Sequence, residues 1–176
     1  GLTRVLDSTA PELKLSGFRV AGGLASGSSG GGLRASGIVT LDQMAFELNE
    51  ATGSTFAVSG GGGGIAMIPG SFLTVTNSTI SGNTATLTGG GIQSNYGGLV
   101  VENSTISGNI TSFFGTNYRF YGGGGVAFLG TPSATPPSGF VANTAIFRNS
   151  TIAGNTTTGS GGGIAGFYEG CLLYTS

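Results

Sequence analysis

The sequence contains no histidine and no tryptophan, and Cys171 is its single cysteine. Without histidine a serine nucleophile has no imidazole base, so the usual hydrolytic triad is excluded. One cysteine excludes both a disulfide scaffold and a zinc site of cysteine and histidine ligands within this chain. We therefore expect no metal and no cofactor, and we look for chemistry among carboxylates, amides and aromatic rings.

Charged residues are also scarce, at 7% of the 176 residues, with a formal net charge of −1. The six basic residues are scattered singly, so they form no patch that could neutralise a run of phosphates. No apolar run approaches the roughly 20 residues that a membrane-spanning helix needs. We expect no nucleic-acid partner and no membrane insertion by this segment.

Glycine is abundant instead, with 37 residues, and 38% of the chain is hydrophobic. A disordered low-complexity chain would lack apolar periodicity, whereas here the apolar residues recur in register. Three segments repeat almost identically: VTNSTISGN at 75–83, VENSTISGN at 101–109 and FRNSTIAGN at 147–155. Regular recurrence of this kind indicates a folded repeat protein.

The first Asn of the repeated segment serves as a register mark. Two degenerate copies lie upstream of the three faithful ones, with Gly17 and Gln43 at the position of this Asn, so the chain has five units. The marks fall at 17, 43, 77, 103 and 149, so the spacings are 26, 34, 26 and 46 residues. Each unit is followed by a glycine run that ends in an aliphatic residue: Leu33, Ile65, Ile92, Val126 and Ile164. A period of this length indicates a solenoid, a propeller or an array.

The alternation of apolar residues before each mark is typical of strands, and no stretch shows the spacing of an amphipathic helix. A 26-residue unit is also too short for the four strands of a propeller blade. We therefore predict an all-β fold, a right-handed parallel β-helix of about five coils. Asn tolerates positive φ and its amides can bond along a stack, so two asparagine columns should mark the turns: Asn77, Asn103 and Asn149, and Asn83, Asn109 and Asn155.

The order of Ile-Ser-Gly-Asn followed by Gly-Gly-Gly-Ile resembles the paired FxxN and GGAI repeats of chlamydial polymorphic outer membrane proteins. It is also similar to the wider set of bacterial secreted and surface proteins built from β-helix repeats. The resemblance covers residues 9 to 167 and implies an extracellular or cell-surface location. It further implies an adhesin-like or autotransporter passenger rod that presents loops to a host or environmental glycan or protein.

Residues 1–170 are predicted to form a single domain, and the absence of obvious polar caps suggests an excerpt from a longer solenoid. The last residues, CLLYTS, do not continue the repeat. We expect residues 171–176, with Cys171, to be a non-native tail.

Two carboxylates are the candidate catalytic residues, since the register places Asp42 and Glu102 in one outward column, two coils apart. That separation is about 9 to 10 Å, near the upper limit for an inverting pair of carboxylates. The favoured interpretation is structural, because Arg148 should lie one coil from Glu102 and form a surface ion pair. Glu47 and Glu50 lie nearby but lack the spacing of a calcium loop.

The candidate ligand-binding residues lie in the long fourth unit, which concentrates aromatic rings beside one arginine: Phe113, Phe114, Tyr118, Arg119, Phe120 and Tyr121. Insertions in a solenoid are loops, and aromatic loops with an arginine suit sugar stacking or a protein contact. The alternative is that these rings pack on the coil edge.

The most consistent function is a non-catalytic segment of a surface or secreted protein. The alternative is a carbohydrate-active β-helix, a polysaccharide lyase or glycoside hydrolase, whose catalytic coil is incomplete or lies outside this segment.

Overall fold

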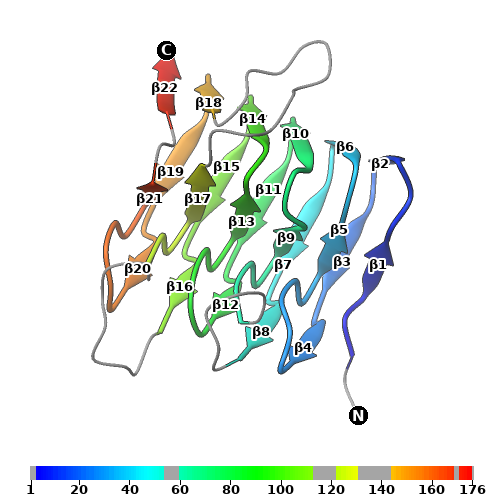
Figure 1. Cartoon of the computed structure of the whole chain (residues 1–176), viewed down its shortest axis with the longest axis horizontal. Helices are drawn as coiled ribbons and strands as arrows, with labels where there is room; N and C mark the ends of the chain where they lie inside the picture. Colours follow the sequence, from blue (N-terminus) through cyan, green and yellow to red (C-terminus); the bar gives the residue numbers. More distant parts are fainter. Residues whose placement is uncertain (1–2, 54–59, 113–121, 131–143, 169–170, 176) are drawn as a thin grey trace.

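The computed structural model describes residues 3–53, 60–112, 122–130, 144–168 and 171–175. Within these residues the chain forms strands and no helix, and it winds into a parallel β-helix of about five coils (Figure 1). Each coil adds one strand to each of four sheets, and every strand pairs in parallel with its equivalent one coil away. The predicted fold is confirmed.

We name the four sheets A to D in the order in which the chain visits them. Sheet A consists of β1 (Leu6–Ser8), β5 (Leu33–Ala35), β9 (Ile65–Met67), β13 (Ile92–Asn95), β17 (Val126–Gly130) and β21 (Ile164–Tyr168). Sheet B consists of β2 (Glu12–Ser16), β6 (Ile38–Asp42), β10 (Phe72–Thr76), β14 (Gly98–Glu102), β18 (Thr144–Arg148) and β22 (Cys171–Thr175).

Sheets C and D have shorter strands. Sheet C consists of β3 (Arg19–Ala21), β7 (Ala45–Glu47), β11 (Thr79–Ser81), β15 (Thr105–Ser107) and β19 (Thr151–Ala153). Sheet D consists of β4 (Leu24–Ser26), β8 (Glu50–Thr52), β12 (Thr84–Ala85), β16 (Ile110–Thr111) and β20 (Thr156–Thr157).

The register is the one that the repeat predicts. Leu73 pairs with Leu99, and Val75 pairs with Val101, so like residues stack from coil to coil. These side chains form one continuous core inside the coils, and Leu73, Leu99 and Ile80 are fully buried. Because strands expose alternate residues, the intervening positions point outward and are freer to vary.

The two predicted asparagine columns perform different roles. Asn77, Asn103 and Asn149 are exposed and have φ of 50°, 48° and 46°, so this column supplies left-handed corners. Asn83 and Asn109 are fully buried and are not among the positive-φ residues. The second column therefore serves hydrogen bonding rather than backbone conformation.

The buried column is a ladder of amides. Asn49 donates from Nδ2 to Asn83 Oδ1 at 3.0 Å, Asn83 to Asn109 at 2.9 Å, and Asn109 to Asn155 at 2.9 Å. Each Nδ2 also donates to a backbone carbonyl of the preceding coil, for example from Asn83 to Phe46 O at 2.9 Å. The ladder satisfies polar backbone groups that the tight turn would otherwise leave buried and unpaired.

A second ladder, which the sequence did not predict, is made by the serine after each corner asparagine. Ser78 N donates to Ser104 Oγ at 3.0 Å, and Ser104 N donates to Ser150 Oγ at 3.2 Å. Each hydroxyl in turn donates to the carbonyl two residues earlier, as Ser78 does to Thr76 O. In the repeated Asn-Ser-Thr, the Asn thus forms the exposed corner, the Ser places its hydroxyl in the buried ladder, and the Thr side chain points outward.

The glycine runs make the corner before sheet A. Gly89 has φ of 58°, which a residue with a side chain adopts only at a cost. A Cβ on Gly90 would lie 2.4 Å from Gly124 O, and one on Gly91 would lie 2.7 Å from Gly125 O. Neighbouring coils therefore approach at this corner more closely than any side chain would allow.

Residues 171–175 form β22, which pairs with β18 and matches Cys171 with Thr144 and Leu172 with Ala145. Parallel pairing uses backbone N–H and C=O groups, which every residue except proline provides. This segment therefore extends sheet B, and its register matches Leu172 and Tyr174 with the core positions Ala145 and Phe147, contrary to the expectation that residues 171–176 do not continue the repeat. The described residues contain no helix that could cross a membrane.

Candidate functional site

The insertions that lengthen the coils all border sheet A. The connection from sheet D to sheet A spans residues 27–32 and 86–91 in regular coils, but 53–64 and 112–125 in the lengthened ones. The connection from sheet A to sheet B spans 36–37 in one coil and 131–143 in another. The connections that vary in length therefore lie on both sides of sheet A. The outer face of this sheet is the one that the variable connections border.

The aromatic candidates fall in one of these insertions. Phe113, Phe114, Tyr118, Arg119, Phe120 and Tyr121 lie outside the described residues. Their connection joins β16 to β17, so it enters sheet A directly. The prediction that they bind a ligand stays a prediction.

Asp42 is occupied by two hydrogen bonds. Its Oδ1 accepts from Thr76 Oγ1 at 2.7 Å and from Asn77 Nδ2 at 2.8 Å. The bond from Asn77, followed by that from Thr76, holds the pKa of the Asp42 carboxyl below its ordinary value. A general acid needs the opposite shift, so Asp42 is poorly suited to proton donation.

Glu102 lies two strands from Asp42 in the predicted column, with Thr76 between them. Its Oε1 is paired with Arg148 Nη1 in the ion pair that the register predicts. Both side chains are partly exposed, so the pair lies on the surface of sheet B. The two carboxylates thus have separate partners.

The acidic stretch near Asp42 does not assemble a metal site. Glu47 is paired with Arg19 at 2.5 Å, and Glu50 is exposed at the start of β8. Among the described residues there is no group of three or more acidic, histidine or cysteine side chains that could hold a metal ion.

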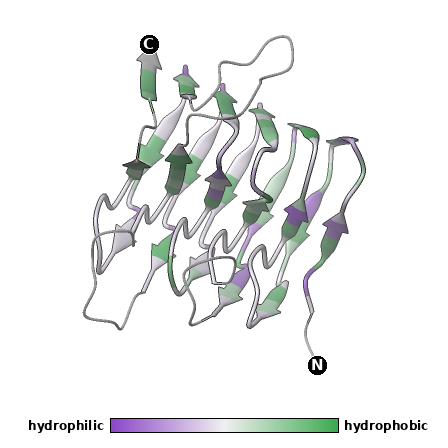
Figure 2. Cartoon of the chain, in the orientation of Figure 1, coloured by the Kyte–Doolittle hydropathy of each residue, from purple (hydrophilic) through white to green (hydrophobic). Residues whose placement is uncertain are grey.

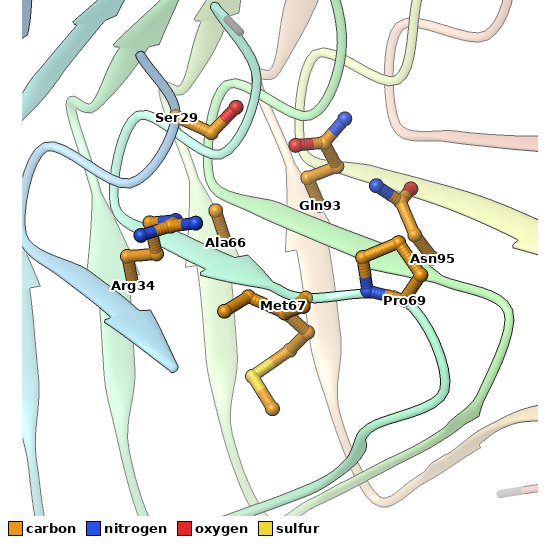
Figure 3. A pocket seen from close by; sticks show the side chains of 8 residues that line it. Ser29, Arg34, Ala66, Met67, Pro69, Gln93 and Asn95 are labelled. Atoms are coloured by element: carbon orange, nitrogen blue, oxygen red, sulfur yellow. The ribbon is translucent and has the colours of Figure 1, made fainter. Parts of the chain in front are cut away.

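The outer face of sheet A contains a small pocket of about 50 Å³, which we call the notch (Figure 3). Its lining residues come from three successive coils and the turns beside them: Ser29, Arg34, Ala66, Met67, Ile68, Pro69, Gln93 and Asn95. Arg34, Ala66 and Gln93 occupy equivalent positions of adjacent strands. The notch exists because a small alanine lies between two long polar side chains.

Gln93 is held in a defined orientation. It is 8% exposed, and its Nε2 donates to Thr88 Oγ1 at 2.9 Å. A Cβ on Gly61 would lie 2.5 Å from the Gln93 amide carbon, so this glycine provides the space in which the amide lies. One N–H of the Gln93 amide is engaged by Thr88, and the second N–H and the carbonyl oxygen remain.

Asn95 lies two residues further along β13, and its side chain stands on the same side of the strand as Gln93 (Figure 3). It is 8% exposed, and its Oδ1 has no hydrogen-bond partner among the described residues. A buried carbonyl oxygen without a partner costs roughly 1 to 3 kcal/mol. The oxygen itself has less than 1 Å² of accessible surface, so it is enclosed by the fold rather than open to the notch.

Arg34 forms the opposite wall. Its Nη1 lies 3.7 Å from Asp7 Oδ2, and the same oxygen is bonded more closely by Arg4 at 2.5 Å. Arg34 is half-exposed, so its remaining N–H groups are accessible to a ligand. Because Asp7 offsets part of the positive charge, the notch carries a weaker positive field than two arginines alone would give.

The outer face of sheet A changes character along the stack. Beyond the notch, Ala127, Leu129, Ala165 and Phe167 form a second, smaller apolar cluster with Tyr96 packed against it. Figure 2 shows the change: β5 and β13 have hydrophilic stretches, whereas β17 is hydrophobic. The face therefore combines a notch lined by both polar and apolar side chains with an adjacent apolar cluster.

The notch residues were not predicted from the sequence, although a signal was present. Sheet A has alanine at three of the five positions equivalent to Gln93, namely Ala66, Ala127 and Ala165. It has Leu129 and Phe167 at the positions equivalent to Asn95. The sequence IQSN thus places two amides where neighbouring coils have apolar residues. A comparison of equivalent positions in successive coils, rather than of the nine-residue repeat alone, would have revealed these two amides.

No protein-family model, no curated protein and no solved structure matches the chain.

Proposed function

We propose that this chain is a non-catalytic, ligand-binding segment of a bacterial cell-surface or secreted protein. In this view the β-helix is an adhesin-like or passenger rod, similar to the repeats of chlamydial polymorphic outer membrane proteins. The observation that carries the proposal is the concentration of coil-length variation on both borders of sheet A. Loops placed by a rigid scaffold are the usual carriers of recognition.

Two features of the outer face of sheet A support a binding role. The notch supplies fixed polar groups, and the cluster of Leu129 and Phe167 supplies apolar surface beside it. Glycan and protein ligands are both bound by such mixtures of polar and apolar contacts. The carboxylates that a lyase or hydrolase would need are engaged elsewhere, Asp42 by Thr76 and Asn77, and Glu102 by Arg148.

The test is binding of the purified chain to a glycan array and to immobilised surface proteins. A variant with residues 113–121 replaced by the short connection of a regular coil should lose binding at least tenfold. Asp42→Asn and Glu102→Gln are the matched controls, and both should bind as the parent chain does. Equal binding by the shortened variant would contradict the proposal, as would polysaccharide cleavage that either carboxylate substitution abolishes.

A further inference from the structure

We propose that Asn103 and Asn149 are acceptor sites for N-linked glycosylation. The co-substrate is a glycosyl diphosphate, in which a sugar is activated by a nucleotide or lipid diphosphate leaving group. The inference goes beyond the proposed function, because it concerns a covalent modification at the corner between sheets B and C and not the outer face of sheet A. It is carried by the way in which the fold exposes some asparagines of glycosylation motifs and buries others.

The chain contains five Asn-x-Ser/Thr motifs, the acceptor sequence for N-linked glycosylation: Asn77, Asn103, Asn109, Asn149 and Asn155. Three of them read Asn-Ser-Thr and lie at the corner between sheets B and C, whereas the other two lie at the turn between sheets C and D. One sequence motif thus occurs in two structural settings, which differ in whether a transferase can reach the asparagine.

The turn between sheets C and D withholds its asparagines. Asn109 is fully buried, and its Nδ2 donates to Ile80 O at 2.9 Å and to Asn155 Oδ1 at 2.9 Å. Asn155 is partly buried, and its Nδ2 donates to Ile106 O at 2.9 Å. These amide nitrogens belong to the buried ladder, so they are not presented to a sugar donor while the chain is folded.

The corner between sheets B and C presents its asparagines. Asn103 and Asn149 are exposed and have φ of 48° and 46°. Among the described residues, no side-chain hydrogen bond engages either amide. Asn77 is also exposed, but its Nδ2 donates to Asp42 Oδ1 at 2.8 Å, so its amide is partly occupied. Asn103 and Asn149 are therefore the best acceptors.

The threonine of each corner motif is also placed for recognition. Thr105 and Thr151 are paired in sheet C, and both side chains are at least partly exposed. In the two coils whose corner residue is not asparagine, the same position holds Arg19 or Ala45. The fold therefore accepts other side chains at this position, and threonine occurs in the coils that have a corner asparagine.

The modification is a group transfer without oxidation or reduction. The Nδ2 atom of the asparagine attacks the anomeric carbon of the sugar, and an N–C bond forms as the C–O bond to the diphosphate breaks. The diphosphate leaves with the bonding electron pair, and the amide nitrogen gives up one proton to a base of the transferase. The reaction needs an amide nitrogen open to attack, which the fold supplies at Asn103 and Asn149.

The experiment incubates the purified, folded chain with UDP-glucose and a soluble glucosyltransferase that reads Asn-x-Ser/Thr. A parallel incubation uses membranes that hold a lipid-linked oligosaccharide and its transferase, and the mass of the added group distinguishes the two donors. Mass spectrometry with electron-transfer fragmentation assigns each added sugar to one asparagine. We expect sugar on Asn103 and Asn149, less on Asn77, and none on Asn109 or Asn155.

Two controls separate the acceptor sequence from its presentation by the fold. A synthetic peptide of residues 106–112 should be modified at Asn109, because the ladder no longer holds its amide. Thr105→Ala should remove the sugar from Asn103, and Thr105→Ser should retain it, since the motif accepts either hydroxyl residue.

Three results would overturn the inference: no sugar on either corner asparagine with either donor, equal sugar on Asn109 in the folded chain, or sugar retained on Asn103 in Thr105→Ala. An unmodified 106–112 peptide would also contradict it, because the fold would then not be what protects Asn109. Denaturation midpoints measured before incubation show that each variant is folded. The outcome is independent of the glycan-array test, so failure of either proposal leaves the other standing.

Discussion

Asn83 and Asn109, one coil apart, are joined through their side chains: Asn83 Nδ2 donates to Asn109 Oδ1 at 2.9 Å, and the same oxygen accepts from Asn83 N at 3.0 Å. The side-chain oxygens of Asn83, Asn109 and Asn155 each accept from two N–H groups of the preceding coil. Chains of hydrogen bonds in a low-dielectric interior polarise one another. The repeated final Asn of the segment is explained by this stacking, without any ligand.

Substitution of Asn83 by alanine should strongly destabilise the protein. It removes the acceptor of Asn49 N and of one N–H of Asn49 Nδ2, and it removes the Asn83 donor to Phe46 O, all within the buried turn. We expect a loss of roughly 3 to 5 kcal/mol in the free energy of unfolding, measured by urea denaturation.

The matched control is Asn103→Ala at the exposed corner. The alanine must adopt the φ of 48° there, a left-handed conformation that asparagine tolerates better than alanine. Its cost should be about 1 kcal/mol, and Asn103→Gly should cost less. Equal losses for Asn83→Ala and Asn103→Ala would show that the two columns do not differ as described.

Replacement of Leu48 by glycine should stabilise the protein. Leu48 is 66% exposed and has φ of 55°, whereas the equivalent positions of neighbouring coils are Gly22 and Gly82, with φ of 70° and 62°. A left-handed conformation costs a residue with a side chain roughly 1 to 2 kcal/mol, and the entropy of glycine offsets part of that.

The expected gain for Leu48→Gly is about 0.5 to 1 kcal/mol in urea denaturation. The reciprocal control, Gly82→Ala, places a Cβ 3.1 Å from the end of the Leu48 side chain at positive φ and should lower stability by about 1 kcal/mol. A loss of stability in Leu48→Gly would indicate that its side-chain contacts outweigh the backbone strain.

Gly90→Ala should be among the most damaging single methyl additions to this chain. The new Cβ would lie 2.4 Å from Gly124 O and 2.5 Å from Ile110 O, both backbone atoms that cannot rotate away. We expect a loss of roughly 3 kcal/mol, the upper part of the range for overpacking.

Gly166→Ala is the control, because a Cβ there meets nothing within 4 Å and its φ is not positive. Its effect on thermal and urea denaturation should stay within about 0.5 kcal/mol. A mild effect at Gly90 would mean that neighbouring coils separate easily at the glycine corner.

Asp42 should make stability depend on pH in the acid range. Its hydrogen bonds from Asn77 and Thr76 lower its pKa below the ordinary 3.8, so the folded state binds its proton less readily than the unfolded state. The resulting stabilisation is fully present above the ordinary value and is lost as pH falls through the folded pKa.

The stability difference between the parent and Asp42→Asn should therefore shrink between pH of about 5 and about 2 in urea denaturation. Asn77→Gly removes the hydrogen bond that lowers the pKa of Asp42 most, and glycine tolerates the φ of 50° at this corner. This variant should therefore lose part of the same pH dependence of stability. A difference that is constant over this pH range would refute the link.

The repeat predicted the register because in a parallel stack identical positions must coincide. One mark per coil was sufficient to place Ser16, Asp42, Thr76, Glu102 and Arg148 in a single column. The same reasoning assigned both asparagine columns to turns, because the identity of a residue does not reveal whether its amide is buried. The difference arises from backbone conformation, which places Asn77 outside the turn and Asn83 inside it.

The notch was missed for a different physical reason. Its walls come from residues 34, 66 and 93, and it depends on a small side chain between two long ones. No local pattern encodes that relation, because each residue is unremarkable within its own strand. Within the described residues, the Oδ1 atom of Asn95 is likewise without a partner because neighbouring coils offer it no donor.

The amide ladder determines which parts of such a chain can vary in length. Its bonds are 2.9 to 3.0 Å long whether they join residues 26, 34 or 46 positions apart. Extra chain inserted beside sheet A is therefore absorbed within its own coil, and the next coil resumes at the same phase. A scaffold of this kind can exchange its connecting segments for others of different length without redesign of its interior, which makes it suitable for grafting foreign peptides.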